Sequence, residues 1–314
     1  MNIRVLFIHF ISVCTILSIP CVGFSGQKIL NPEDPIHRLQ AKDSDRIIFS
    51  SYMSGSWQIW SIDPDGKNLK QLTKTEQEFH YPACSPDPCK IACVSNERDI
   101  WVMKLDDKPQ KLPNVPPNCN HPAWSPDGNK LIFVCYTFEK SKEDSDIWTF
   151  DLKTGNVQKL MTQDNIQSFP AWSPDGKEIV YTSGYRVNST KIIEELWRVN
   201  SDGTNPRPLI NDGFYNIQPV WSADGKNIAF ASSRSGNMDI WVVDKDGGNQ
   251  NQLTFNKSYD ADPSWSPDGS KICFTSTRSG RMEIWVMDSD GKNPRQLTGR
   301  SGSEAESMHP CWHK

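Results

Sequence analysis

The chain has 314 residues, of which 36% are hydrophobic, and it contains 22 prolines and 12 tryptophans. This is the composition of a globular protein, and the length is enough for one large domain or two small ones. The formal net charge is −4 and the sequence holds no basic block, so there is no electrostatic reason to expect nucleic acid as a partner.

Residues 1–25 have the pattern of an export signal. Arg4 supplies the positive start, an apolar run from Val5 to Val22 follows, and small residues then fit a cleavage site. A membrane anchor is one alternative, but the run is short and polar residues interrupt it. A second alternative is a lipoprotein anchored through Cys21, although the preceding Ser-Ile-Pro matches that pattern poorly. We expect a periplasmic or secreted protein in which a linker over 26–45 precedes the folded domain.

The cysteines do not predict a disulfide scaffold. Cys14 and Cys21 lie in the signal, which leaves an odd number of cysteines with no regular spacing. Cys84 and Cys89 flank one turn and could form a bridge in an oxidising compartment. Paired CxxC motifs, which a structural zinc site would need, do not occur in the sequence.

Two ladders of tryptophan run through the rest of the chain. The first follows the phrase WSPDG and holds Cys84, Trp124, Trp172, Trp221, Trp265 and Trp312. The second follows the phrase DIW and holds Trp60, Trp101, Trp148, Trp197, Trp241 and Trp285. Only Trp57 lies outside both ladders. Self-similarity at 40–49 residues indicates a repeat architecture, and we interpret the tryptophans as packing between neighbouring repeats.

Each repeat predicts four short strands, as the unit at 261–298 illustrates. Alternating apolar and polar residues favour strands at 262–266, 271–276, 283–288 and 295–298. The Ser-Pro-Asp-Gly between the first two has the residue preferences of a type I turn, in which Pro presets φ and Gly accepts the left-handed exit.

Four strands every 45 residues or so are typical of a β-propeller blade. Six copies of the third strand predict an all-β, six-bladed propeller over 46–314. The first blade lacks its innermost strand, and the last phrase stops at Trp312. We therefore expect the C-terminal strand to pair with the N-terminal blade and close the ring.

The phrase P-x-W-S-P-D-G, followed by I-x-F-x-S, I-W-x-x-D-x-D-G-x-N and Q-L-T, resembles the TolB-type (WD40-like) propeller repeat over about 46–314. The resemblance implies an exported protein that binds envelope partners such as a peptidoglycan-associated (Pal-like) lipoprotein. TolB-type proteins also carry an N-terminal α/β domain, and the stretch between the signal and the first blade is too short and polar to form one. We expect a stand-alone TolB-like propeller.

Strand order predicts which residues reach the mouth of the central channel. The WSPDG and DxDG turns lie on one face, and the segments leading into each first strand lie on the other. The residue three before each first-ladder position therefore lies near the mouth, and these residues are Tyr81, His121, Phe169, Gln218, Asp262 and His309, with His80 one step earlier. Their side chains differ between blades while the framework repeats, as expected for a site grafted on a repeat.

Two long loops on the same face, 136–145 and 184–194, are the second candidate binding feature. They offer aromatic and charged contacts suited to a protein partner or a glycan, with solvated loop variation as the alternative. The loop residues concerned are Tyr136, Phe138, Tyr185 and Arg186, and Phe214, Tyr215 and Tyr259 outside the loops add to these contacts.

Enzymatic function is the runner-up hypothesis. We expect no cofactor, but His121, Gln218, Asp262 and His309 could converge on a divalent metal in the channel. That arrangement resembles the oligogalacturonate lyases and would imply a metal-dependent polysaccharide lyase or hydrolase. Polar residues that hold channel water are the plainer interpretation. The sequence has no GxSxG, HExxH or glycine-rich phosphate motif, so our first hypothesis is a non-enzymatic binding propeller.

Overall fold

The computed structural model describes residues 45–86, 90–105, 107–139, 142–187, 192–299 and 305–313, without the side chains of 138, 139, 142 and 143. The chain divides into two compact units, 1–41 and 42–314, and all described residues lie in the second. The predicted signal peptide and the linker up to residue 44 therefore lie outside the described residues.

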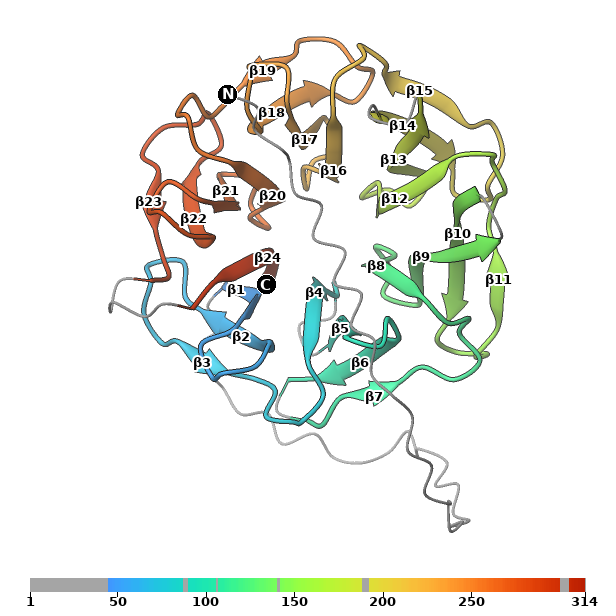
Figure 1. The fold of residues 1–314 in the computed structure, drawn as a ribbon, viewed down its shortest axis with the longest axis horizontal. Helices are drawn as coiled ribbons and strands as arrows, with labels where there is room; N and C mark the ends of the chain where they lie inside the picture. Colours follow the sequence, from blue (N-terminus) through green and yellow to red (C-terminus); the bar gives the residue numbers. More distant parts are fainter. Residues whose placement is uncertain are drawn as a thin grey trace. The chain divides into compact units, whose positions relative to one another are not determined.

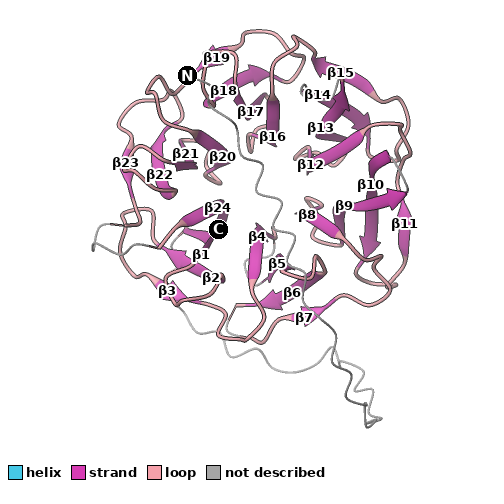
Figure 2. Cartoon of the chain, viewed as in Figure 1, coloured by secondary structure: helices cyan, strands magenta, loops and turns pink. Residues whose placement is uncertain are grey.

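Strands and their connections make up all of the described part, which contains no helix (Figure 2). It accordingly holds no helical segment long and apolar enough to span a bilayer. The first three strand groups are β24 (Ser307–His313), β1 (Arg46–Ser51), β2 (Gln58–Ile62) and β3 (Lys70–Gln71); β4 (Phe79–Cys84), β5 (Lys90–Ser95), β6 (Ile100–Lys104) and β7 (Gln110–Lys111); and β8 (Cys119–Trp124), β9 (Lys130–Glu139), β10 (Lys142–Asp151) and β11 (Val157–Lys159).

The remaining groups follow the same order from inner to outer strand. They are β12 (Ile166–Trp172), β13 (Glu178–Arg186), β14 (Ile192–Asn200) and β15 (Arg207–Ile210); β16 (Asn216–Trp221), β17 (Asn227–Ser232), β18 (Asp239–Asp244) and β19 (Asn251–Gln252); and β20 (Asp260–Trp265), β21 (Lys271–Ser276), β22 (Glu283–Asp288) and β23 (Arg295–Gln296). The predicted strands at 271–276 and 283–288 coincide with β21 and β22.

The pairing of these strands is antiparallel within each group. Four groups are separate four-stranded sheets, whereas the groups of β8 and β12 share an eight-stranded sheet through one parallel pairing, Ser145 with Ile166. Figure 1 shows the innermost strands β24, β4, β8, β12, β16 and β20 around the middle of this unit and the outer strands at its rim. The C-terminal strand β24 pairs with β1, so Trp312 lies opposite Ile47.

The WSPDG turns close as their residue types predict. After β20, the N–H of Gly269 donates to the carbonyl of Ser266 at 2.9 Å, and the Ser266 hydroxyl donates to Asp268 at 2.6 Å. Asp268 also accepts the N–H of Ser270 at 3.0 Å, and Gly269 has φ of +71°. Side-chain hydrogen bonds to the local backbone and a left-handed glycine together fix the hairpin.

Apolar packing joins each group to the next. Between the groups of β4 and β8, Ile100 packs in one cluster with Leu131 and Trp124. Between the last and first groups, Ile284 and Val286 pack with Ile47 and Trp312. Tryptophans of both ladders belong to these clusters or pack against them, which confirms the predicted role of the ladders in core packing.

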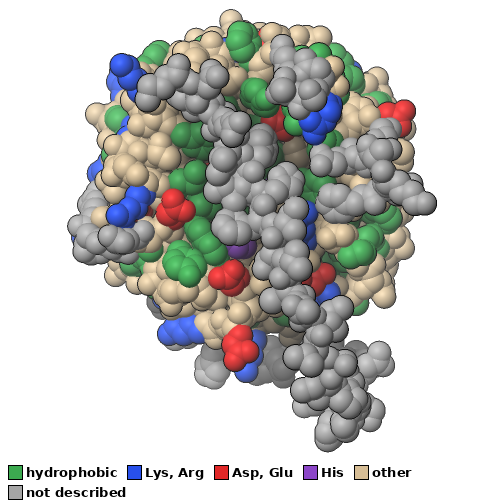
Figure 3. Space-filling model, in the orientation of Figure 1, with side chains coloured by type: hydrophobic (Ala, Val, Ile, Leu, Met, Phe, Trp, Pro, Cys, Tyr) green, Lys and Arg blue, Asp and Glu red, His purple; other side chains and the backbone are tan. Residues whose placement is uncertain are grey.

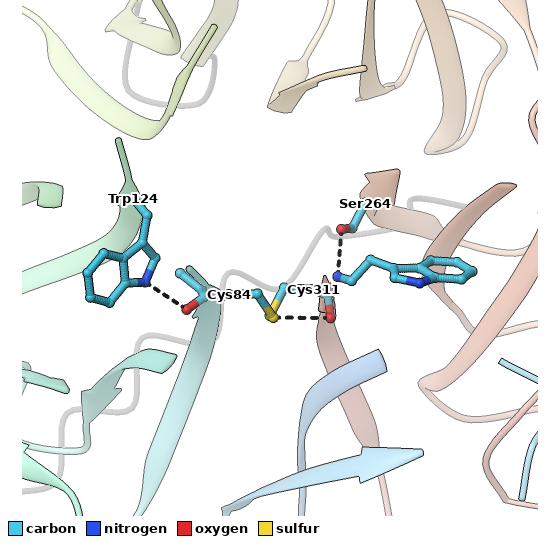
Figure 4. Close-up of a disulfide and its surroundings, with 6 residues drawn as sticks. Cys84, Trp124, Ser264 and Cys311 are labelled. Atoms are coloured by element: carbon cyan, nitrogen blue, oxygen red, sulfur yellow. Dashed lines mark hydrogen bonds between the residues drawn. A yellow bond between two sulfur atoms is a disulfide. The ribbon is translucent and has the colours of Figure 1, made fainter. Parts of the chain in front are cut away.

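Cys84 lies where the other inner strands carry tryptophan, and its environment explains the exception (Figure 4). Trp124 donates its indole N–H to the carbonyl of Ala83 in the neighbouring group at 3.0 Å. Cys84 makes the matching approach to Cys311, with Sγ 3.4 Å from the Cys311 carbonyl oxygen, and the two form a disulfide. The predicted Cys84–Cys89 bridge is therefore wrong, because the neighbouring inner strand β24 brings Cys311 to Cys84.

The two disulfides should differ in their contribution to stability. Cys84 and Cys311 are 227 residues apart, whereas Cys119 and Cys135 are 16 apart. In the chain-entropy model, removing the first costs about 5 kcal/mol and removing the second about 3 kcal/mol. Denaturant unfolding of the Cys84→Ala/Cys311→Ala and Cys119→Ala/Cys135→Ala variants measures both losses of stability. Equal losses would contradict the assignment of these two disulfide pairs. Reductant should leave the variant that lacks all four of these cysteines unchanged.

Candidate functional site

The six predicted mouth residues share one unusual backbone conformation. Their φ angles lie between +48° and +58°, in the left-handed region, and each residue precedes a proline. They are Tyr81, His121, Phe169, Gln218, Asp262 and His309. This conformation costs a non-glycine residue about 1–2 kcal/mol, so a ring of six is a repeated strain that the surrounding structure must hold.

A β-bulge in each inner strand contains the strained residue. In β8, pairing with β9 shifts register between Asn120 and Ala123, and His121 lies in the gap. The same shift occurs around Tyr81, between Ile217 and Val220, and between Ala261 and Ser264. A bulge interrupts the ladder and redirects a side chain, so the repeat presents one variable residue per inner strand.

Four of these side chains stack in succession. The ring of His309 lies 3.9 Å from that of Tyr81, and Tyr81 meets His121 edge-on at 4.9 Å between centroids. The His121 ring in turn lies 3.8 Å from that of Phe169 at an interplanar angle of 32°. These distances place an aromatic arc across four neighbouring inner strands.

The other two residues form a polar pair. The backbone N–H of Asp262 donates to Oε1 of Gln218 at 3.0 Å, and the Gln218 amide donates back to the Asp262 carboxylate. The hydroxyl of Thr275 donates to Oδ2 of Asp262 at 2.9 Å and accepts the N–H of His309 at 3.2 Å. Thr275 thus links the polar pair to the aromatic arc, and the sequence analysis did not single it out.

Burial controls the protonation of the site. Desolvation lowers the pKa of both His121 and His309 to about 3, and it lowers that of His80 to about 4. The Nδ1 atoms of His121 and His309 are buried without a hydrogen-bond partner. Desolvation raises the pKa of Asp262 to about 6, against the opposing effect of the Thr275 hydrogen bond. At neutral pH the site therefore holds neutral imidazoles and one carboxylate.

Each of the four proposed metal ligands contacts another side chain. Tyr81 separates the two histidines, and Gln218 and Asp262 bond to each other. Within the described ranges, no three His, Cys, Asp or Glu side chains are grouped closely enough to hold a metal.

The two predicted loops are largely strand. Strands β9 and β10 pair from Lys130–Asp151 out to Glu139–Lys142, and β13 and β14 pair out to Arg186–Ile192. The prediction of loops was wrong because Tyr136 and Thr137 on β9 and Ile192 and Ile193 on β14 favour strand and continue the hairpins beyond the length seen in the other repeats.

The remaining candidate residues lie on or beside these hairpins. Tyr136 is half-buried with the Arg98 guanidinium 6.0 Å from its ring, and the side chain of Phe138 lies outside the described residues. Tyr185 is 41% exposed and its hydroxyl donates to Glu195 at 3.4 Å, while Phe214 is 44% exposed. Arg186 is exposed, and Tyr215 and Tyr259 are half-buried.

Glu194 and Arg98 are two groups near these residues that the sequence analysis missed. The Oε2 atom of Glu194 is buried without a partner, and desolvation raises the pKa of Glu194 to about 7. Its strand position pairs with Gly184, where an added Cβ would meet the Glu194 side chain at 3.4 Å. Neither residue belongs to the repeated phrase, so no pattern could have indicated it.

Four-stranded groups arranged around a middle lined by variable side chains define the class of β-propeller proteins. The family model described as the TolB beta propeller domain matches residues 43–231 and 185–312, and the chain belongs to this family.

Solved and curated relatives agree with this assignment. The crystal structure of TolB from Acinetobacter baumannii is 26% identical, with a TM-score of 0.72 over 86% of this chain and 67% of that one. The Tol-Pal system protein TolB of Ruthia magnifica is 30% identical over 105 residues, which are 32% of this chain and 24% of that protein. The chain matches only 21–36% of the length of its curated relatives.

An enzyme shares the fold but little sequence. An oligogalacturonate lyase in complex with manganese is 18% identical, with a TM-score of 0.59 over 81% of this chain and 73% of that one. This likeness concerns the fold alone.

The strain at the mouth can be measured at Phe169, whose φ is +50°. Phe169→Gly and Phe169→Ala remove the same aromatic ring, but only glycine tolerates this φ without steric cost. We expect the glycine variant to be more stable than the alanine variant by up to about 1 kcal/mol. Glycine relieves the backbone strain, and its greater conformational entropy in the unfolded state offsets part of that gain. Denaturant midpoints report the difference, and a more stable alanine variant would contradict the strain.

The pH dependence of stability should carry opposite contributions from His309 and Asp262. His309 has a pKa of about 3 in the folded state and about 6.5 in the unfolded state. As pH falls between these values, protonation favours the unfolded state, and the free energy of unfolding decreases by up to about 1.4 kcal/mol per pH unit. Asp262 has a pKa of about 6 when folded, so its protonation adds stability as pH falls from 6 towards 4.

His309→Phe should therefore make the protein less acid-sensitive and Asp262→Asn should make it more so. Unfolding midpoints between pH 4 and pH 7 test both signs. Parallel profiles for the wild type and both variants would show that neither group titrates as described.

Proposed function

We propose that this protein is an exported, non-enzymatic binding propeller whose channel mouth engages an envelope protein. In this proposal the six strand groups are six blades, and the pairing of β24 with β1 closes the ring. The carrying observation is that one strained pre-proline position recurs in six inner strands and holds Tyr, His, Phe, Gln, Asp and His in turn. A constant backbone with a changing side chain is the arrangement expected of a recognition site.

The chemistry around the mouth favours a protein partner. Half-buried His309, Tyr81 and Phe169 stack with buried His121 in a rigid aromatic arc, and aromatic residues dominate the energetics of protein interfaces. Exposed Tyr185 and Phe214 belong to segments on the same side of the sheets, at the ends of the strands opposite to the WSPDG turns. In Figure 3 apolar side chains gather on the left of the middle of the visible face, and a histidine shows beside them.

Family membership favours a particular class of partner. A relative bears the name of a Tol-Pal system protein, so a Pal-like lipoprotein of the same cell is the first partner to test, with a glycan as the alternative. Two disulfides support export to the periplasm or beyond, since disulfides persist in oxidising compartments.

Purified Pal-like protein provides the test. We expect Phe169→Ala and His121→Ala to weaken its binding at least tenfold in titration calorimetry, because each removes part of the arc. Asp290→Ala, in an exposed turn between β22 and β23 at the other end of the strands, is the matched control and should bind as the wild type does. Equal binding by all three variants would reject the mouth as the interface.

The enzymatic alternative has its own test. A metal-dependent lyase using His121 and His309 requires a stoichiometric divalent metal that both His121→Ala and His309→Ala lose. Elemental analysis of the purified wild type and of both variants would measure the metal. A stoichiometric metal in the wild type that both variants lose would overturn the non-enzymatic proposal. The contacts of Tyr81 with both histidines and the bond between Gln218 and Asp262 support the binding function.

A further inference from the structure

A pocket lies at the opposite end of the inner strands from the channel mouth, between the group of β16 and that of β20. Its volume is about 500 Å³, within the range of about 300–1,000 Å³ that small-molecule sites occupy. The turns after β16, β20 and β22 contribute to it. The lining residues are Ser222, Ala223, Asp224, Asn227, Val242, Trp265, Pro267, Asp268, Gly269 and Ser289.

One cause of the pocket is the alanine in the phrase WSADG. At three other junctions the turn glycine faces the proline of the preceding turn, as where an added Cβ on Gly176 would lie 3.3 Å from Pro126 and one on Gly225 would lie 3.7 Å from Pro174. At this junction Ala223 replaces the proline, and a Cβ on Gly269 would meet nothing within 4 Å. The missing pyrrolidine ring opens the space.

Val242 on β18 also lines the pocket. At the preceding junction the equivalent residue is Arg198, whose guanidinium donates to the Lys245 carbonyl at 3.1 Å and so bridges the two groups. Val242 is too short and apolar to make such a bridge. Valine also occupies this position on β6 and β22, as Val102 and Val286, so the alanine is the change that distinguishes this junction.

The lining combines apolar and hydrogen-bonding surface. Trp265, Val242 and Pro267 provide apolar contact, while Asp224, Asp268, Asn227 and two serines provide polar groups. Hydrogen bonds from Ser266 and Ser270 hold the pKa of Asp268 at about 2, and one from Ser222 lowers that of Asp224, so both stay ionised acceptors. Lys226 lies 3.4 Å from Asp224 and compensates one of the two charges.

We propose that this pocket is a binding site for a neutral saccharide. A pyranose ring presents an apolar face of C–H groups, which suits the indole and aliphatic groups of the lining, and an edge of hydroxyl donors, which suits the carboxylates. The site is separate from the channel mouth and does not depend on the proposed function.

Amide NMR shifts and titration calorimetry with cellobiose, maltotriose and chitotriose test the proposal. We expect millimolar binding of at least one probe, with shifts concentrated at 222–227 and 268–270. Ala223→Pro restores the ring present in the other turns and should reduce affinity at least tenfold. It should also raise the melting temperature by about 1–3 °C, because proline suits this turn, so lost binding would not reflect misfolding.

Val242→Arg fills the pocket from the other side and should also abolish binding. Pro174→Ala is the matched control, because it makes the same proline-to-alanine change at the junction that Arg198 bridges. That variant should bind as the wild type does. The proposal is overturned if no probe binds at 20 mM, if shifts appear only at other residues, if Ala223→Pro binds normally, or if lysine methyl ester outcompetes the saccharides there.

Discussion

The pairing of β24 with β1 is the contact on which the rest of the described structure depends. It joins residues from the two ends of the folded unit, with Arg46 opposite His313 and Ser51 opposite Ser307. Without β24 the first group would lack its innermost strand, and His309 would not meet Tyr81. The Cys84–Cys311 disulfide covalently fixes this junction, at the position where the other inner strands use tryptophan. A covalent crosslink thus holds a pairing between residues far apart in the chain.

The second constraint is the left-handed residue before each inner-strand proline. Both proline and a Cβ disfavour this conformation, and it recurs because the bulge fixes it between well-packed strands. Ile228, Phe230 and their counterparts are fully buried beside the bulges, so the packing holds the strain in place. The outcome is a rigid platform, on which a side chain can change from Phe to Asp without altering the backbone.

The two ends of the sheets differ in how the repeat varies. At the strained pre-proline position the six repeats carry five residue types, with histidine twice, and burial keeps the histidines neutral and raises the pKa of Asp262. At the turn end the repeats are almost uniform, and a single proline-to-alanine change opens a pocket. Both candidate sites are therefore places where one repeat differs from the others. At the pre-proline end the side chain changes, and at the turn end a proline ring is absent.

The sequence alone predicted the order of the strands in the repeat, the turn chemistry and the equivalence of the six pre-proline residues. These follow from periodicity, turn residues and spacing, which are local properties of the chain. It did not determine the partner of Cys84, the extension of β9 and β13 into long hairpins, or the separation of His121 from His309 by Tyr81. The tertiary structure decided these, because they depend on which side chains of neighbouring strands meet across a junction, and residues far apart in the chain set those distances.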